Sequence, residues 1–426
     1  MKRLSVTLLL SALCAALAEP PAGKNWQLVF EDNFDYPDAQ LEQNWISQNG
    51  PNGHILCSRW RENARVEDGI LKLINRKEQR GGQDWTSASI WTKRRFKYGY
   101  FECRYRYAAA TGTNNSFWLT TIHGGAKLPE GYKHFEIDIN EGHYPDEINI
   151  NIHNWSDIWT NDAGKRQHNA WPKSVCLTPP KADEDAKSNP AAHEILLDQP
   201  LRASKVRFSS RHPTRFHLRA LRVFPKLADD AEYPAITSGA ALPEGLLDYA
   251  RTATIADSSG SNPDFPQYRV EHVIDGGIGT SWITPYDGEK FIELDLGAER
   301  EVGCVQFLTG WRDGAKGYVF YVDTFKVELW VDGVWREVAA QEPIPYVPAI
   351  DLSADFHTYA MEWNEKELVF FFDGKEIDRR KNDLCHWEAP IFLSLAIARF
   401  AGPISDAIDG TVMAVDYVKV WQEKAE

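Results

Sequence analysis

The stretch His134-Phe-Glu-Ile-Asp-Ile-Asn-Glu-Gly142 decides the fold expected of this chain, because it resembles a β-strand yet carries three carboxylates. Side chains two residues apart share one face of a regular strand, so Glu136 and Asp138 point the same way and Glu141 points to the opposite face. A β-bulge at Ile139–Asn140 would bring Glu141 back, and bulges are common beside active sites. The stretch therefore predicts a bulged strand with three acids in one cleft. The alternative is a surface strand with solvated acids.

The residues after the acids predict a partner strand. Ile148, Ile150 and Ile152 alternate with polar or aromatic residues at positions 147–155. The isoleucines are expected in the core and the odd positions on a groove, with residues 142–146 as the turn. Similar alternating segments recur and no long segment has a helical period, so the class is all-β. The other expected strands are 65–75, 86–94, 98–107, 115–121, 358–363, 368–373, 391–397 and 413–421.

The first 18 residues predict a secretory signal peptide. Lys2 and Arg3 precede a short apolar run, and small residues ending at Ala18 form a cleavage site. Cys14 raises the alternative of a lipoprotein, but the preceding Leu13 fits a lipidation site poorly. We therefore expect a protein that is periplasmic, cell-surface or extracellular after cleavage. No other segment is apolar and long enough to span a membrane.

The composition and net charge narrow the classes of molecule that the protein is expected to bind. Removing Lys2 and Arg3 takes the net charge from −14 to −16, which disfavours nucleic acid and anionic membranes. The negative net charge also makes a highly sulfated polymer a less suitable substrate, although a local basic cleft can override the effect of the net charge. The 16 Trp, 16 Tyr and 20 Phe suit carbohydrate binding, because apolar sugar faces stack on aromatic rings, or they serve a large β core. Five cysteines remain in the mature chain, an odd and widely spaced set that allows at most two disulfides and indicates no zinc site: Cys57, Cys103, Cys176, Cys304 and Cys385.

Proline-rich and charged segments divide the chain. Residues 179–190, 228–246 and 341–348 look like linkers or loops. We expect a first domain formed by residues 24–165 and 350–424, with a second module, residues 175–345, inserted in one of its exposed loops.

The acidic motif resembles that of glycoside hydrolase family 16, retaining endo-glycanases with a concanavalin-like jelly roll. Glu136-Ile-Asp-Ile-Asn-Glu141 matches the family's bulged E-x-D-x-x-E signature. Further segments resemble the family in the same order, namely Trp26–Phe34, Tyr98–Arg104, Ser116–Leu119, Phe356–Trp363, Phe372–Gly374 and Val415–Trp421. Laminarinase- and lichenase-type members carry Trp-Pro and Gly before the first Glu, where this chain has Tyr132-Lys-His-Phe135. The region is more similar to the agarases, porphyranases and related endo-β-galactosidases, including those that cut host O-glycans.

The inserted module resembles a discoidin-like (coagulation-factor type C) β-sandwich. Tyr268–Trp282, Phe291–Gly297 and Phe325–Trp335 are similar to the first part of that family. The segments that resemble its closing strands, 203–209 and 215–224, come earlier in the chain. We therefore expect a circularly permuted module, in which residues 195–225 pair with strands from 250–340. Its role would be to bind glycan or to shape the catalytic groove.

The resemblance implies residue roles. Glu136 is the expected nucleophile and Glu141 the general acid/base, with Asp138 between them to hold their pKa values apart. A retaining enzyme needs two carboxyls about 5–5.5 Å apart, and a bulged strand can supply this spacing. Three crowded carboxylates cannot all ionise cheaply, so one is expected to keep a proton. The expected substrate-binding residues, each also explicable by core packing or solvation, are Trp118, His153, Asn151, Trp155, Trp85 and Arg59.

The leading hypothesis is a secreted, monomeric endo-β-glycosidase that hydrolyses internal β-galactosidic linkages of a polysaccharide or host O-glycan. The alternative within the enzyme class is an endo-β-1,3-glucanase of the laminarinase type. The alternative outside it is a non-catalytic glycan-binding or adhesion protein, but a lectin has no need for both Glu136 and Glu141. No cofactor is expected and no metal is assigned to the site; either domain could hold a structural calcium ion, but no cluster of ligands in the sequence requires one.

Overall fold

The structure is a computed structural model that describes residues 20–122, 128–160, 164, 166–177, 191–228, 231–239, 241–313, 317–342 and 348–424. The predicted signal peptide and the linker 179–190 lie outside these residues. The described residues confirm the all-β class, and none of their helices is long and apolar enough to cross a membrane. Their helices are short 3₁₀ turns: η1 (Asp38–Gln43), η2 (Arg61–Asn63), η3 (Ile236–Ser238), η4 (Tyr249–Thr252), η5 (Val270–Ile274), η7 (Arg399–Ala401) and η8 (Asp406–Ile408).

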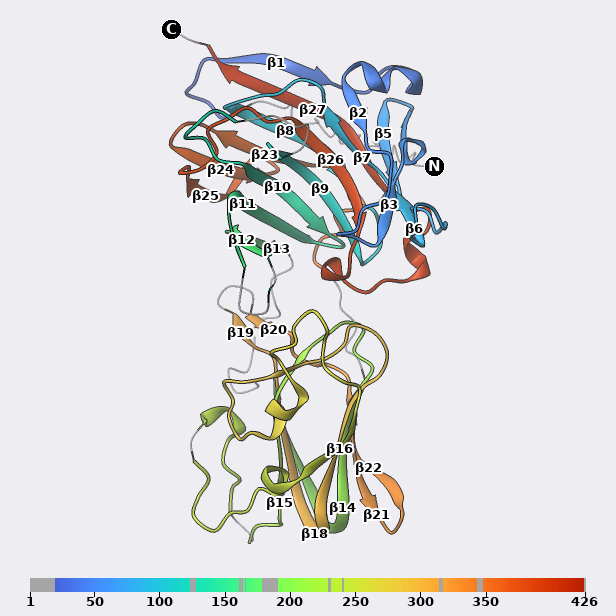
Figure 1. Cartoon of the computed structure of the whole chain (residues 1–426), viewed down its shortest axis with the longest axis vertical. Helices are drawn as coiled ribbons and strands as arrows, with labels where there is room; N and C mark the ends of the chain where they lie inside the picture. The colour runs from blue at the N-terminus through green and yellow to red at the C-terminus, as the bar shows by residue number, and fades with distance from the viewer. Residues whose placement is uncertain are drawn as a thin grey trace, which may run out of the picture.

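Two eight-stranded sheets pack face to face as a β-sandwich (Figure 1). The first, here called the cleft sheet, has the order β12 (Arg166–Ala170), β11 (Glu147–Thr160), β10 (Phe135–His143), β9 (Thr113–Thr120), β26 (Ile391–Ile397), β7 (Ser89–Thr92) and β2 (Trp45–Ser47), with β13 (Lys173–Cys176) paired to β11. The second, the outer sheet, has the order β25 (Lys375–Lys381), β24 (Glu367–Phe372), β23 (His357–Trp363), β8 (Gly99–Arg106), β27 (Val412–Glu423), β5 (Ile70–Ile74) and β4 (Ala64–Glu67), with β1 (Trp26–Asp32) paired to β27.

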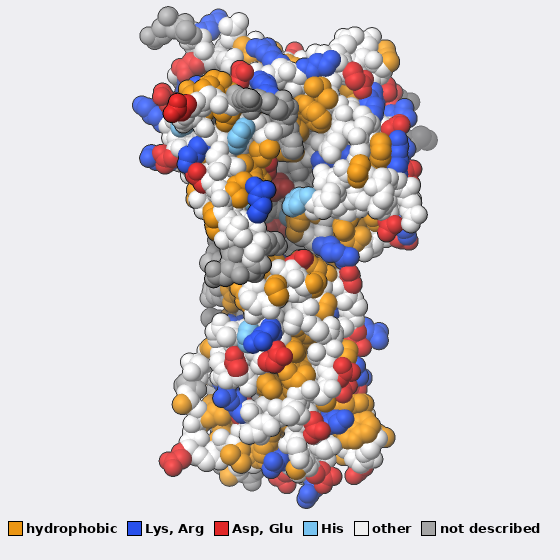
Figure 2. All heavy atoms as spheres, viewed as in Figure 1, with side chains coloured by type: hydrophobic (Ala, Val, Ile, Leu, Met, Phe, Trp, Pro, Cys, Tyr) orange, Lys and Arg blue, Asp and Glu red, His pale blue; other side chains and the backbone are white. Residues whose placement is uncertain are grey.

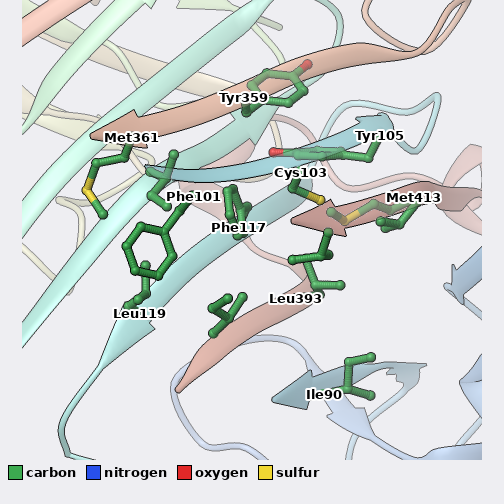
Figure 3. Close-up of a cluster of buried hydrophobic side chains, with 14 of the residues drawn as sticks. Ile90, Phe101, Cys103, Tyr105, Phe117, Leu119, Tyr359, Met361, Leu393 and Met413 are labelled. Atoms are coloured by element: carbon green, nitrogen blue, oxygen red, sulfur yellow. The ribbon is translucent and has the colours of Figure 1, made fainter. Parts of the chain in front are cut away.

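The core between the two sheets follows from alternation along their strands. Phe117 and Leu119 of β9 face Phe101 and Tyr105 of β8 across it (Figure 3). The isoleucines of β11 are buried in the same core, as their spacing predicted. The residues between them on the cleft sheet are therefore free to face outward and form a site.

The predicted strand 65–75 is wrong, because the chain folds back within it to form the hairpin β4–β5. Asp68 and Gly69 at the turn have φ angles of 55° and 72°. Consecutive residues in the left-handed region close a tight hairpin, and Asp and Gly tolerate that region. The apolar alternation on both sides concealed this turn.

The residues between β13 and β23 form a separate seven-stranded sheet with its own core. Its order is β17 (Trp282–Ile283), β15 (His217–Phe224), β18 (Lys290–Thr309), β14 (Ala192–Ser210), β21 (Phe325–Val331) and β22 (Val334–Gln341), with β16 (Thr254–Ser258) paired to β18. β14 pairs with β18 and β21, and β15 with β18, which is the pairing that the permutation hypothesis requires. A small hairpin of β19 (Trp311–Asp313) and β20 (Gly317–Val319) lies at the end nearest the host sandwich (Figure 1).

Four cysteines, Cys57, Cys103, Cys304 and Cys385, are buried free thiols. These four therefore form no disulfide, and the two bridges that the count allowed are not made by them. Burial raises the pKa of the Cys103 and Cys385 thiols well above the usual range, which leaves them protonated packing groups.

Candidate active site

A bulge in β10 brings the three acids of the motif to one cleft. Asp138 lies opposite Trp118 of β9, but Asn140 lies opposite Phe117, so one residue of β10 is extra at Ile139. The predicted bulge is confirmed. Glu136, Asp138 and Glu141 all line a cleft of about 620 Å³ on the cleft sheet. Figure 2 looks onto this face, where acidic side chains lie in the hollow.

The bulge is held from behind by buried tyrosines of the outer sheet and the loop after it. Asn140 points into the core, where its Nδ2 donates hydrogen bonds to Tyr105 Oη at 2.6 Å and Tyr107 Oη at 2.7 Å. Gly142 lies flat against Tyr107, because a Cβ at this position would be 2.2 Å from the ring. Ile139 and Asn140 both face the core, and this break in alternation turns Glu141 outward.

Each acid has a different set of partners. Asn114 Nδ2 donates to Glu141 Oε1 at 2.7 Å, and Trp155 Nε1 donates to Glu136 Oε2 at 3.2 Å. His153 Nε2 lies 3.2 Å from Asp138 Oδ2 and 3.8 Å from Glu136 Oε1. Asp138 is 2 % exposed, and its Oδ2 receives no hydrogen bond from the described residues.

The electrostatics of the cleft favour a retained proton. Burial raises the pKa of Glu136 well above its usual range, and the charge of Asp138 raises it further. Burial and the charge of Glu141 likewise raise the pKa of Asp138 well above its usual range. Ionising both members of this buried pair is costly, so the raised pKa values favour one retained proton.

His153 and Asn151 lie beside the acids rather than along the lining of the cleft. Asn151 Nδ2 is 2.8 Å from His153 Nε2, and His153 Nδ1 is 2.7 Å from His168 Nε2. Both side chains were predicted to contact a sugar, and that role stays a prediction; in the structure His153 contacts Asp138, and Asn151 contacts His153. Trp155 does line the cleft, with its ring stacked on His168 at 3.7 Å.

Two rows of side chains cross the cleft sheet at right angles to the strands. Trp118 of β9 lies opposite Asp138 and stacks on Phe392 of β26 at 4.3 Å, and Phe392 stacks on Trp91 of β7 at 5.4 Å. Beside Glu141 runs a row of hydroxyls formed by Ser116, Ser394 and Ser89. The two rows form an aromatic platform next to a polar one.

The cleft contains more residues than the sequence indicated. Of the last two predicted substrate-binding residues, Arg59 lines the cleft, whereas Trp85 is buried outside it in a small cluster with Cys57. Asn114 and Ser116 share the face of Trp118 by simple alternation, so the sequence could have identified them. The other lining residues depend on strand order, which no local pattern reveals: Gln48, Asn52, His54, Ile55, Ser89, Trp91, Ile122, Phe392, Ser394, Ala396 and Phe400.

Glu136, Asp138 and His153 offer three ligand atoms within 4.8 Å of one another, and this is the one such group in the described part of the chain. Calcium takes six to eight oxygen ligands, whereas this group includes an imidazole nitrogen. We therefore assign no calcium site to it.

A family model and several curated relatives match parts of this chain. The model of glycosyl hydrolases family 16 matches residues 54–174 and 323–416. A β-glucanase of Rhodothermus marinus is 32% identical over 168 residues, which cover 36% of this chain and 58% of that protein. β-Porphyranase D of Zobellia galactanivorans is 28% identical over 184 residues, covering 36% and 41%.

Among solved structures, the laminarinase catalytic domain of Thermotoga petrophila has a TM-score of 0.46 and 17% identity over 95% of this chain and all of that one. The chain spans 58% or less of the length of the curated relatives described above. The family model covers half of the chain and includes the whole acidic motif. The chain therefore belongs to glycosyl hydrolase family 16.

Proposed function

We propose that the protein is a retaining endo-β-glycosidase that cleaves internal linkages of a glycan by double displacement. The observation that carries this proposal is the bulge that turns Glu136, Asp138 and Glu141 into one open cleft. Two carboxyls on one strand, with a third between them, suit a covalent mechanism better than a lectin, which needs no such crowding of acids.

The two steps assign a task to each acid. Glu136 attacks the anomeric carbon and forms a glycosyl-enzyme ester, while Glu141 gives its proton to the departing glycosidic oxygen. Glu141 then takes a proton from water, which attacks the same carbon and releases Glu136 as a carboxylate. The hydrogen bonds from Trp155 to Glu136 and from Asn114 to Glu141 hold the two carboxyls in place.

The two rows across the sheet support binding of a sugar chain. The ring of Trp118 offers an apolar surface for the C–H face of a sugar next to the acids. The serine row, which includes Ser116 and Ser394, offers hydroxyls to the polar edge of the same chain. An open cleft with both kinds of surface accommodates the interior of a polymer, which is what endo-cleavage requires.

For the substrate we propose a β-galactosidic linkage of a polysaccharide or host O-glycan. Tyr132-Lys-His-Phe135 in place of the Trp-Pro and Gly of β-glucan-type members supports this choice, and one relative is a β-porphyranase. The relative from Rhodothermus marinus is a β-glucanase, which favours β-1,3-glucan as the second candidate.

A product screen tests both proposals. The protein would be incubated with agarose, porphyran, carrageenan, mucin O-glycans and laminarin, and products would be identified by mass spectrometry. New reducing ends with retained β-configuration in an early NMR spectrum are expected. Cleavage of laminarin alone would replace the galactan proposal, and binding without any new reducing end would favour a lectin.

We further propose that the inserted module is a permuted discoidin-like sandwich that walls or extends the cleft. Trp282 is fully buried in its core, whereas Trp311 is 37% exposed at the end nearest the host sandwich. Arg399 Nη1 donates to Asp287 Oδ1 of the module at 2.7 Å, and the next residue, Phe400, lines the cleft.

Separately, we propose that residues 1–18 direct secretion and that the mature protein is a monomer. N-terminal sequencing of the secreted protein and light scattering would check these two proposals.

A further inference from the structure

Arg59 is a buried cation that lines the cleft without a charged partner. It belongs to β3 (Cys57–Arg59), which pairs in parallel with β6 (Trp85–Ser87). The side chain is part of the cleft lining, yet the residue is only 7% exposed. Its position on a short, doubly paired strand holds the backbone in place, because Arg59 N also donates to Gly50 O at 2.9 Å.

No carboxylate of the described residues lies within ion-pair distance of Arg59, and its buried Nε has no hydrogen-bond acceptor there. Its neighbour Arg61 shows the contrast, because Arg61 is paired with Asp38 and Glu42. Burial lowers the pKa of Arg59, and the one side chain that offsets this by a hydrogen bond is the buried thiol of Cys57. Burial raises the pKa of that thiol, so it stays neutral and supplies no counter-charge. A buried charge is normally paired, because a charge that leaves water without a partner is strongly destabilising.

Arg59 shares the cleft lining with polar residues. Gln48, Asn52 and His54 come from the same segment of chain as Arg59 and also line the cleft. The acids of the cleft lining all come from β10, on the other side of β9, β26 and β7. The cleft therefore has an acidic side for chemistry and a side whose one permanent charge among the described lining residues is positive.

The strand pairing places Arg59 near the Glu141 end of the cleft. Ser394 of β26 lies level with Ser116 and Glu141, and β26 then runs to Ile397, whose N–H donates to Cys57 Sγ at 3.3 Å. Moving along β26 from Phe392 past Ser394 thus leads from the aromatic row, past Glu141, to the strand that carries Arg59.

We propose that Arg59 binds an anionic substituent, a sulfate ester or a carboxylate, on a sugar held at the Glu141 end of the cleft. The guanidinium offers planar, paired N–H donors that match the oxygens of either group. The proposal rests on the proposed hydrolysis of a glycan and narrows its substrate to an acidic one. The net negative charge of the protein is compatible with this, because one local cation needs one substituent and not a dense polyanion.

Matched substrates and matched variants test the proposal. Porphyran would be compared with its desulfated form, and a glucuronate-bearing arabinogalactan with its carboxyl-reduced form. We expect wild-type kcat/KM to favour the charged member of at least one pair by tenfold or more, and the pair identifies the anion. Arg59→Met should abolish that preference, and Arg59→Lys should keep part of it. A wild-type preference for the neutral member of both pairs, or an equal loss on both members in Arg59→Met, would overturn the proposal.

Measurements of thermal stability and ion binding test the anion site independently of whether the protein cleaves a glycan. If Arg59 were structural, Arg59→Met would lower Tm; we expect Tm to stay or rise, because the variant removes an unpaired buried charge. Sodium sulfate or sodium glucuronate, compared with sodium chloride at equal ionic strength, should raise the Tm of wild type by more than that of Arg59→Met, because non-specific salt stabilisation acts on both proteins alike. That result would support the anion site even if no glycan is cleaved, and an equal response of both proteins would refute it.

Discussion

Two buried carboxyls on the two sheets of the host sandwich have opposite surroundings. Glu102 of the outer sheet is 4% exposed and accepts hydrogen bonds from Tyr417 Oη at 2.8 Å and Tyr100 Oη at 3.1 Å. Asp138 of the cleft sheet is as deeply buried, but its Oδ2 receives no hydrogen bond from the described residues. Burial alone therefore does not set these two acids apart; the hydrogen bonds that each of them receives do.

This difference in hydrogen bonding affects the pKa of each acid and the stability of the fold. Burial raises the pKa of both acids, but the two tyrosine hydroxyls partly offset this at Glu102, whereas the charge of Glu141 adds to it at Asp138. Burying a carboxyl without donors is destabilising, and folds retain such groups mainly where chemistry needs a perturbed pKa. The cleft sheet thus holds strain that the outer sheet avoids.

The largest effect is expected from the acids themselves. Glu141→Gln should lower kcat by about 10²–10⁴-fold, because general acid/base assistance is lost. Glu136→Gln should cost at least as much, since no covalent intermediate can form. Glu102→Gln is the matched control on the outer sheet and should keep near-wild-type rates. Initial rates of reducing-end release measure all three, and a large loss in Glu102→Gln would remove the contrast between the sheets.

The second-largest effect on the rate is expected from the residues that hold the bulge in place. Asn140→Leu leaves the hydroxyls of Tyr105 and Tyr107 without their donor and lets the bulge shift, and a displacement of about 1 Å can cost about 10²-fold in rate. We expect kcat to fall by about 10- to 100-fold while KM changes by less than about threefold. Tyr107→Phe, which retains the bond from Asn140 to Tyr105, should lose less.

Tyr417→Phe is the control for Asn140→Leu, because it removes a buried hydrogen bond to Glu102 on the other sheet. Its stability loss should be similar, about 1 kcal/mol, with no change in kcat. Equal falls of kcat in both variants would show a general loss of stability and not a role in positioning.

The stability of the cleft should depend on pH. The folded pKa of Asp138 is raised above its unfolded value, so its contribution to stability is fully present below the unfolded pKa of about 3.9 and is lost as pH rises through the folded pKa. Asp138→Asn should therefore gain about 1–3 kcal/mol over wild type near neutral pH and little at acid pH. Glu102→Gln should gain less, because it gives up two good hydrogen bonds. Urea unfolding at several pH values measures the difference.

The smallest effect is expected from the aromatic row. Trp118→Ala should raise KM on a polymer by about two- to tenfold, since an aromatic contact is worth about 0.5–1.5 kcal/mol. Trp26, whose ring contacts Tyr100 on the outer sheet, provides the comparison, and Trp26→Ala should leave KM unchanged. Steady-state kinetics on polymer would decide, and an unchanged KM in Trp118→Ala would assign that ring to packing with Phe392.

Local pattern predicted the parts of the molecule that depend on neighbours in sequence. The odd spacing between Glu136 and Glu141 required an irregular residue, and the bulge is there. The alternating isoleucines of β11 were sufficient to orient that strand, because side-chain direction has a period of two. The same reasoning missed the hairpin within 65–75, since a tight turn between two apolar segments leaves the alternation almost unbroken.

Tertiary structure decided everything that depends on which strands lie side by side. β7, β9 and β26 are far apart in the chain, yet their pairing makes one platform of Trp118, Phe392 and Trp91. The same pairing leaves Asp138 Oδ2 without a hydrogen bond and Arg59 without a carboxylate partner among the described residues. The sequence by itself determined that this chain has an acidic bulged strand in an all-β fold. Only the packing of distant strands determined which polar groups are paired, because hydrogen-bond and charge partners depend on proximity in space.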